Sequence, residues 1–263
     1  MAKIASYIAS TWASRYFWSN LALSDLRSRW RGSRLGVFWS VLQPMGFAAL
    51  ISIVFSRLLS VDLVAFVPYV LSGVLFWECF SFCITGGALA NIQAAPYIKQ
   101  KKLPLVIYSL RVCLVGVVTF ALSSVTLLAW LVFALPQNIG VHLLALVAGL
   151  LALFSVLWPA ASILSLLTPR YRDIQHALNL LLQALWFASP VYFTEDMFRN
   201  GGLHVLVDFN PIYHLLELFR DPILRGVWPD IIHFYWSICS AALLAVVCMY
   251  FHYKLERRTV FFL

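Results

Sequence analysis

Ionisable side chains are rare inside the long apolar stretches of this sequence, and two of them are candidates for chemistry. Glu78 interrupts the apolar run 63–89, and Arg111 lies near the start of the run 106–134. A charge inside a membrane is costly, so it is normally paired or exposed to a water-filled path. Glu78 could meet Arg111 across a helix bundle, or either could line such a path. Arg111 could also extend its head group to the membrane surface.

The common signatures of catalysis do not occur in the sequence. It has no Gly-Lys dipeptide and therefore no P-loop to hold nucleotide phosphates. It has no H-E-x-x-H, no G-x-S-x-G and no pair of aspartates one residue apart. The six histidines are scattered, without a ligand pair at helical spacing. We therefore predict no catalytic residue, no metal site and no cofactor bound by this chain.

The composition predicts that the elements around these residues lie in a membrane. Of the 263 residues, 62% are hydrophobic and only 11% are charged, whereas soluble domains carry roughly 25% charged residues. The net charge of +8 could suggest a nucleic-acid partner. In a membrane protein, however, the positions of the charges matter more than their sum, so we expect no nucleic acid. No charge-free stretch begins before about Leu35, so no cleavable signal peptide is expected.

Six segments are apolar enough to cross a bilayer, for which a helix needs about 20 residues. The uncharged run 112–169 is too long for one helix, and the turn-forming residues 135–140 divide it. We predict an all-α integral membrane protein whose six transmembrane helices are 35–56, 63–89, 106–134, 142–167, 174–194 and 231–253. The expected regions are an N-terminal cytoplasmic or interfacial region (1–34), the transmembrane domain (35–253) and a cytoplasmic tail (254–263).

The distribution of lysine and arginine predicts the orientation. Fourteen basic residues lie in the N-terminal region, the loops 99–102 and 170–172 and the tail, against four in the opposite loops. Because cytoplasmic loops carry the excess of basic residues, both termini should be cytoplasmic. The localisation that we expect is a bacterial inner membrane.

Two further segments are expected to be helical without crossing the membrane. Ile4, Ile8, Trp12 and Tyr16 recur every four residues, which is typical of an amphipathic helix in the membrane interface. A packed cytoplasmic helix would have the same pattern. Between the fifth and sixth spans, residues 195–230 contain two semi-apolar pieces, 203–209 and 212–224. Short re-entrant helices would fit there, and an ordinary outer loop is the alternative.

Aromatic residues make up 16% of the chain, and some fall in the middle of predicted spans on a common face. Flat apolar rings suit sliding contact with the C–H faces of sugars, although core packing is an alternative role for each of them. Together with Glu78, these residues form our predicted channel lining: Trp39, Phe47, Tyr69, Phe76, Glu78, Phe80, Trp186 and Phe187.

Several strings resemble the membrane (permease) subunits of ABC-type polysaccharide exporters. Residues 25–44, D-L-R-S-R-W-R-G-S-R-L-G-V-F-W-S-V-L-Q-P, resemble the family pattern R-D-L-x-x-R-Y-R-x-S-x-L-G-x-x-W-x-x-x-x-P. Further matches are Tyr171-Arg172-Asp173, Ser189-Pro190-Val191, Asn210-Pro211, Glu217-Leu218-Phe219-Arg220 and the tail 255–258. The match is collinear over nearly the whole chain. The sequence departs from the family at 103–105, Leu-Pro-Leu, where Phe-Pro-Arg is common.

The resemblance implies export of O-antigen, capsule or teichoic acid by a homodimer with two ATPase subunits, which bind the ATP and Mg. The lipid-linked polysaccharide would enter at Arg27, Arg29, Arg31 and Arg34. The loop 91–104 would receive the motion of the ATPase through Tyr97, Lys99, Lys101 and Lys102. The periplasmic gate would contain Asn210, Pro211, Glu217 and Arg220. The alternatives are an ABC exporter of drugs or lipids, an ion-coupled secondary transporter and a membrane-embedded enzyme acting on lipid-linked sugars.

Overall fold

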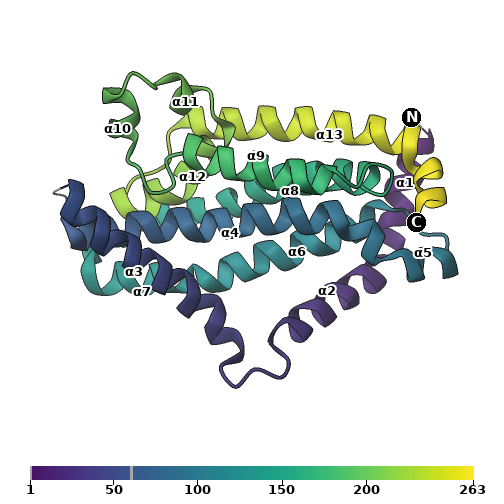
Figure 1. Cartoon of the computed structure of the whole chain (residues 1–263), viewed down its shortest axis with the longest axis horizontal. Helices are drawn as coiled ribbons and strands as arrows, with labels where there is room; N and C mark the ends of the chain where they lie inside the picture. The colour runs from purple at the N-terminus through teal and green to yellow at the C-terminus, as the bar shows by residue number, and fades with distance from the viewer. Residues whose placement is uncertain (1, 60–61) are drawn as a thin grey trace.

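The computed structural model describes residues 2–59 and 62–263, and within these residues the regular structure is helical throughout. Its long helices run roughly along one common axis (Figure 1). Both chain termini lie at the same end of this bundle, beside α1 and α5. We call this the terminal end, and the opposite end, where α10 and α11 lie, the distal end.

Five segments are long and apolar enough to cross a membrane: Gly36–Leu58, Leu63–Gln100, Val106–Ala134, Val141–Leu167 and Ile231–Phe262. Their principal helices are α3 (Trp39–Leu59), α4 (Leu63–Gln93), α6 (Val106–Ser123) with α7 (Val125–Ala134), α8 (Ala145–Leu167) and α13 (Ile231–Thr259). These segments confirm five of the six predicted spans, and the chain is a multi-pass membrane protein.

The remaining predicted span, 174–194, forms a shorter helix than expected. Helix α9 (Ile174–Ala188) has 15 residues, which corresponds to about 22 Å at 1.5 Å per residue. It ends because Pro190 lacks a backbone N–H and disfavours a helical conformation in the residue before it. Ser189 accordingly has an extended ψ of 145°. The apolar residues 191–193 continue beyond the helix in irregular backbone, so the six-span count stays a prediction.

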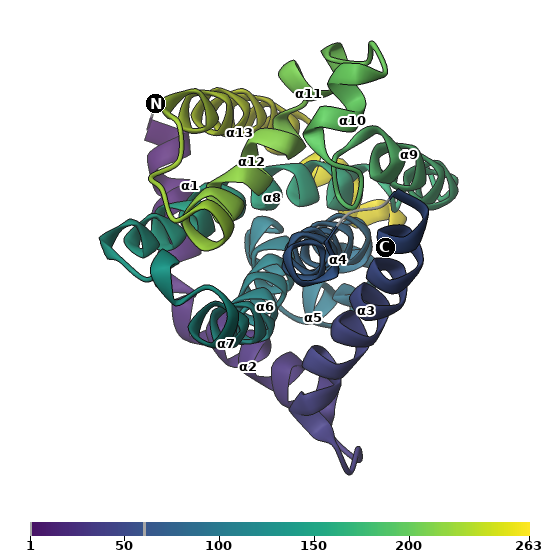
Figure 2. The ribbon, with the colours of Figure 1, turned by 90° about the vertical axis from the view of Figure 1, so that its left-hand side faces the viewer.

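Helix α4 is the centre of the bundle, as the view along the axis shows (Figure 2). It packs against α3, α6, α8 and α9. Most of its apolar window is buried, whereas the windows of α3 and α13 are mostly exposed. Small residues allow the close approach of α4 to α8: a Cβ atom on Gly87 would lie 2.4 Å from Cβ of Ala161. Close contact through small residues is characteristic of helices that pack within membranes.

The N-terminal region forms α1 (Ala2–Ala13) and α2 (Arg15–Trp30). Ile8, Trp12 and Tyr16 are exposed, as an interfacial stripe requires, and the side chain of Ile4 lies outside the described residues. Helix α2 packs against α6. The connection between α2 and α3 projects sideways from the bundle (Figure 1).

The distal segment contains more helix than the sequence predicted. It comprises α10 (Glu195–Asn200), α11 (Val205–Asp208), α12 (Pro211–Arg220) and a π-helical turn, η4 (Asp221–Arg225). The predicted pieces 203–209 and 212–224 correspond to α11 and to α12 with its π turn, whereas α10 was not predicted. The other short elements are α5 (Ala95–Gln100) and the 3₁₀ turns η1 (Gly36–Phe38), η2 (Pro136–Asn138), η3 (Val141–Leu144) and η5 (Val260–Phe262).

The contact between α4 and α8 can be tested with Gly87→Ala. The added methyl group must push the two helices apart, and overpacking of this kind costs about 1–3 kcal/mol. We expect the melting temperature of the purified protein in detergent to fall by several degrees. The matched control is Gly46→Ala in α3, where an added Cβ has no heavy atom within 4 Å. An equal change in both variants would contradict this packing.

Candidate functional site

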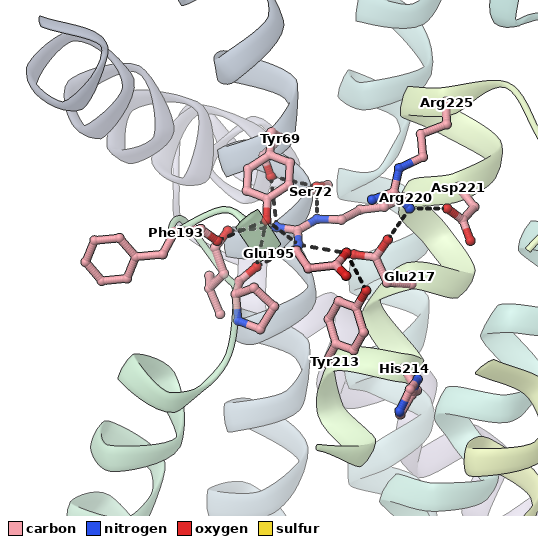
Figure 3. A network of polar contacts seen from close by, with 12 residues as sticks. Tyr69, Ser72, Phe193, Glu195, Tyr213, His214, Glu217, Arg220, Asp221 and Arg225 are labelled. Atoms are coloured by element: carbon pink, nitrogen blue, oxygen red, sulfur yellow. Dashed lines mark hydrogen bonds and ion pairs between the residues drawn. The ribbon is translucent and has the colours of Figure 1, made fainter. Parts of the chain in front are cut away.

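A buried arginine organises the distal end of the bundle. The side chain of Arg220, in the last turn of α12, is 1% exposed. Its guanidinium donates hydrogen bonds of 2.6 Å to the carbonyl oxygen of Pro190 and 2.8 Å to that of Val191 (Figure 3). These carbonyls belong to the irregular segment that follows α9. Arg220 therefore fastens this segment to α12.

The same guanidinium also contacts α4. Its Nη1 donates to the Tyr69 hydroxyl over 3.1 Å and its Nε to the Ser72 hydroxyl over 3.2 Å. It lies 3.8 Å from the centroid of the Tyr69 ring, which adds a cation–π attraction. The Tyr69 hydroxyl in turn donates to the Phe193 carbonyl over 3.0 Å. Three segments that are distant in sequence therefore meet at one side chain.

Acidic side chains compensate the charge of Arg220. Glu217, one helical turn earlier, is buried with its Oε1 3.5 Å from Nη1 of Arg220. Its other oxygen accepts a 2.6 Å bond from Arg225, which also pairs with Asp221. The π-helical turn brings Asp221 and Arg225 into this group, and π turns are frequent at functional sites. A buried charge is tolerated when it is paired and hydrogen-bonded in this way.

Asn210 fixes the start of α12. Its side-chain oxygen accepts from the backbone N–H of Ile212 over 3.0 Å, a helix N-cap. Its amide nitrogen donates to the Ser189 hydroxyl over 2.9 Å. Pro211 occupies the first helical turn, where its missing N–H is harmless. We call Tyr69, Ser72, the backbone of 189–193, Asn210, Glu217 and Arg220 the distal clamp.

A glycine leaves the room that the clamp needs on α4. A Cβ atom at Gly73 would lie 2.2 Å from the Val191 carbonyl oxygen and 2.9 Å from Nη2 of Arg220.

Outside the clamp, Glu195 in α10 accepts from Tyr213 and Arg199, each over 2.7 Å. Burial acts to raise the pKa of Glu195, but the bonds from Tyr213 and Arg199 outweigh it and hold the pKa below its usual value. Glu195 is therefore a carboxylate at neutral pH.

A second polar group lies between α2, α4 and α6. Nε of Arg111 lies 3.0 Å from Oδ2 of Asp25 in α2. Of the alternatives left open for Arg111, the contact with Glu78 is not formed, because Asp25 is the acidic partner that α2 brings to α6. Glu78 is exposed on α4. One turn further along α4, the guanidinium of Arg29 lies 4.9 Å from the ring centroid of Phe82.

The four arginines predicted at the substrate entrance are all exposed: Arg27, Arg29, Arg31 and Arg34. Arg27 and Arg31 border a hollow of about 460 Å³ along α2, whose other lining residues are Asn20, Leu23, Ser24 and Ser28. Guanidinium groups bind phosphate oxygens through paired hydrogen bonds. This face of α2 can therefore bind an anion.

The residues predicted to contact an ATPase gather at the terminal end. Tyr97, Lys99, Lys101 and Lys102 are exposed on and just after α5. This short helix is held by buried Ile98, and Glu256 of α13 accepts from the backbone N–H of Leu105 over 2.9 Å. The surface is therefore basic and attached to the bundle on both sides.

The structure separates the predicted channel-lining residues into groups. Trp39, Phe47 and Phe187 are exposed on α3 and α9, and the ring of Phe47 lies 6.5 Å from that of half-buried Trp186. Half-buried Phe80 lies 6.3 Å from the ring of Phe76, which is fully buried and packs against Phe219. Tyr69 belongs to the distal clamp. The predicted gate residues Asn210, Pro211, Glu217 and Arg220 lie together in or beside this clamp.

The contact partners of Arg220 and Arg111 were not predicted from the sequence. Tyr69 was predicted as channel lining, and Ser72 carried no signal. Asp25 stood in the recognised motif, but its partner Arg111 lies 86 positions later. One signal in the sequence could have pointed to the contact between Arg220 and 190–191. A buried arginine needs hydrogen-bond acceptors, and the carbonyl oxygens beside Pro190 have no partner within a helix.

Comparison with known proteins places these features in a family context. A family model described as "ABC-2 type transporter" matches residues 17–224. The chain is 23% identical over 207 residues to the O-antigen export system permease protein RfbA of Klebsiella pneumoniae, covering 77% of this chain and 78% of the relative. It is 24% identical over 212 residues to the O-antigen export system permease protein RfbA of Myxococcus xanthus, covering 80% of this chain and 81% of the relative. It is also 24% identical over 212 residues to the polysialic acid transport protein KpsM of Escherichia coli, covering 78% of this chain and 80% of the relative.

The distal clamp predicts that Arg220→Met is strongly destabilising. The change leaves Glu217 and the 190–191 carbonyls without their donor, and removing one partner of a buried pair typically costs about 3–5 kcal/mol. We expect a lower melting temperature and faster protease cleavage within 189–230. In the control Arg199→Met, the two ion pairs of an exposed arginine are lost, each worth about 0–1 kcal/mol. If Arg220 did not hold these segments together, the two variants would be equally stable.

The ion pair between α2 and α6 predicts non-additive mutations. Asp25→Asn and Arg111→Gln should each lower the melting temperature. The double variant should be about as stable as Arg111→Gln alone, because the interaction is already lost in either single variant. Coupled neighbours typically show interaction energies of about 0.5–3 kcal/mol. Thermal unfolding of the four proteins in the same detergent measures this coupling, and strictly additive losses would count against the pair.

Proposed function

This chain belongs to the ABC-2 type transporter family, and on that premise we propose that it is the channel-forming membrane subunit of an ATP-driven polysaccharide exporter. The cargo that we propose is a lipid-linked, O-antigen-like polysaccharide, moved across a bacterial inner membrane. The observation that carries the proposal is the collinear series of motifs, three of which, at 189–191, 210–211 and 217–220, meet in the distal clamp. Relatives named for O-antigen export and polysialic acid transport, each matched over more than three quarters of this chain, support a glycan as the cargo.

The energy source in this proposal is a separate ATPase subunit. The sequence has no P-loop, so two ATPase copies would bind ATP and Mg and dock on a homodimer of this chain. The exposed basic residues on and after α5 support the terminal end as the docking surface. The excess of lysine and arginine in the segments at this end supports a cytoplasmic orientation. Both termini would then be cytoplasmic, and the distal end periplasmic.

The entrance that we propose lies along the basic face of α2. A glycan carrier with a pyrophosphate group would meet Arg27 and Arg31 at the hollow beside α2. Arg29 and Glu78 would continue a polar path toward the middle of α4, because an exposed carboxylate within a span requires water or a partner. The ion pair between Asp25 and Arg111 holds α2 against the bundle and so sets the position of this entrance.

At the distal end, the clamp supports a role as the exit structure. It holds the segment after α9 against α4 and α12 through a few strong bonds centred on one side chain. Opening the exit would require these bonds to move together or to break together. The exposed aromatic rings of α3 and α9 lie between the two ends and would provide sliding surfaces for sugar rings.

The proposal is tested by the surface glycan of a strain that lacks this chain, together with its membrane-extracted lipid-linked sugars. We expect one surface polymer to be lost while the same polymer accumulates on its carrier lipid. The wild-type gene should restore the surface polymer. Unchanged surface glycans would contradict polysaccharide as the cargo and redirect the search to lipids or drugs.

The same strain tests the entrance. Basic residues near a membrane surface contribute about 1 kcal/mol each to attraction of anionic groups. We therefore expect the double variant Arg27→Gln/Arg31→Gln to restore roughly a tenth or less of the wild-type surface polymer at equal protein level. The control Arg57→Gln removes an exposed charge from the last turn of α3, away from α2, and should restore export fully. Full export by the α2 variant would exclude this face as the entrance.

A further inference from the structure

A polar cavity at the distal end has no role in the mechanism described above. It is an open hollow of about 920 Å³ bordered by α10, α11, α12 and the start of α13. None of the predicted gate or channel-lining residues borders it. Its walls combine aromatic rings with acidic and basic groups, and the lining residues used below are Asp208, Phe209, Asp221, Trp228, Asp230 and Trp236.

The aromatic walls offer flat surfaces, and contacts between rings orient two of them, Phe209 and Trp236. Phe209 and Trp228 are 66% and 57% exposed. The ring of Phe209 stands edge-on to that of Trp236, with centroids 6.2 Å apart. Trp236 is itself stacked on His214 at an interplanar angle of 7°. Rings held in this way can pack against the C–H face of a sugar without a large loss of conformational entropy.

Paired histidines fix the inner wall where α12 meets α13. Nε2 of His214 is 3.0 Å from the carbonyl oxygen of Asp208, so this nitrogen must carry the proton that it donates. Nδ1 of neutral His214 is then an acceptor, and it receives the Nδ1–H of His233 over 2.9 Å. The Nε2 atom of His233 is left as an acceptor, 3.8 Å from Asp221. These buried histidines therefore hold α12 and α13 together behind the hollow.

The polar groups of the rim are also held in place. Arg199 pairs with Glu195 over 2.7 Å and with Oδ1 of Asp208 over 3.0 Å. Oδ1 of Asp230 caps α13 through the N–H of Ile232. A carboxylate can accept several hydrogen bonds through its two oxygens, so these residues keep acceptor capacity for hydroxyl groups.

The charge of the cavity selects among ligand classes. Four carboxylates, Glu195, Asp208, Asp221 and Asp230, face two guanidinium groups, Arg199 and Arg225. This excess of negative charge disfavours phosphate and anionic lipid head groups. Among the described residues, no three histidine, cysteine, aspartate or glutamate side chains are grouped so as to hold a metal ion. A neutral ligand that is rich in hydroxyl groups suits both the rings and the acceptors.

We propose that this cavity binds a neutral sugar unit of the polysaccharide as it leaves the distal end. The inference rests on the proposed function and adds a second, outer contact to it. A sugar held beside the exit would slow the return of the chain into the channel between successive ATP hydrolysis cycles. Binding there needs only modest affinity, because the next unit must replace the first.

Binding can be measured with the purified full-length chain in lipid nanodiscs. The probe is a set of oligosaccharides released by mild acid from the bacterium's own surface polysaccharide. We expect saturable binding by calorimetry that weakens at least tenfold in Trp228→Ala and in Asp208→Asn. The matched control is Trp12→Ala, an exposed tryptophan of α1 at the terminal end, which should bind as the wild type does. Equal melting temperatures confirm that each variant is folded.

The outcomes separate this inference from the proposed function. If the fragments do not bind, or bind all variants equally, while the deletion strain still loses that polymer, the sugar site is wrong and polysaccharide export stands. If surface glycans are unchanged in the deletion strain, the proposed function fails first. Binding of inorganic pyrophosphate that is lost in Arg199→Gln would also overturn the sugar site, because it would identify the cavity as an anion site.

Discussion

The distal end depends on how the charge of Arg220 is accommodated away from water. A guanidinium can be buried only where its donors meet acceptors and an opposite charge lies nearby. Here the acceptors are carbonyl oxygens of the segment after α9, the hydroxyl groups of α4 and the carboxylate of Glu217. Each of these groups has to stay in place for the others to be satisfied. The path of 189–193, the start of α12 and the π-helical turn therefore form one unit.

Elsewhere in the chain, too, the apolar bundle restricts where charged side chains can lie. Its central helix, α4, is covered on most sides by apolar neighbours. Within the described bundle, the ion pair between Arg111 and Asp25 is formed where α2 covers the end of α6. Glu78 remains exposed at the middle of α4, on the side where Arg29 packs on Phe82. The polar surface is thus concentrated on the face of α2 and at the two ends of the bundle.

The sequence was sufficient for features that follow from composition, whereas long-range pairing required the structure. Apolar runs located five membrane-spanning segments, and the recognised motifs included Asn210 and Arg220. The end of α9 was missed because residues 191–193 are apolar like the helix before them, although Pro190 was a visible stop signal. The partner of Arg111 was missed because Asp25 lies in the N-terminal region, outside the predicted spans, whereas Glu78 lies within one. Ser72 and the clamp role of Tyr69, which was predicted as channel lining, were missed because neutral donors and acceptors carry no distinctive spacing.

The contacts that Arg220 makes with 190–191 are to main-chain atoms. The hydrogen bonds that hold this segment therefore do not depend directly on which side chains it carries. The side chains of Val191 and Tyr192 are nevertheless buried in the apolar core, so packing rather than hydrogen bonding restricts the residues at these positions. A substitution there would change how the segment packs, while the bonds from Arg220 to the main chain could still hold its backbone path.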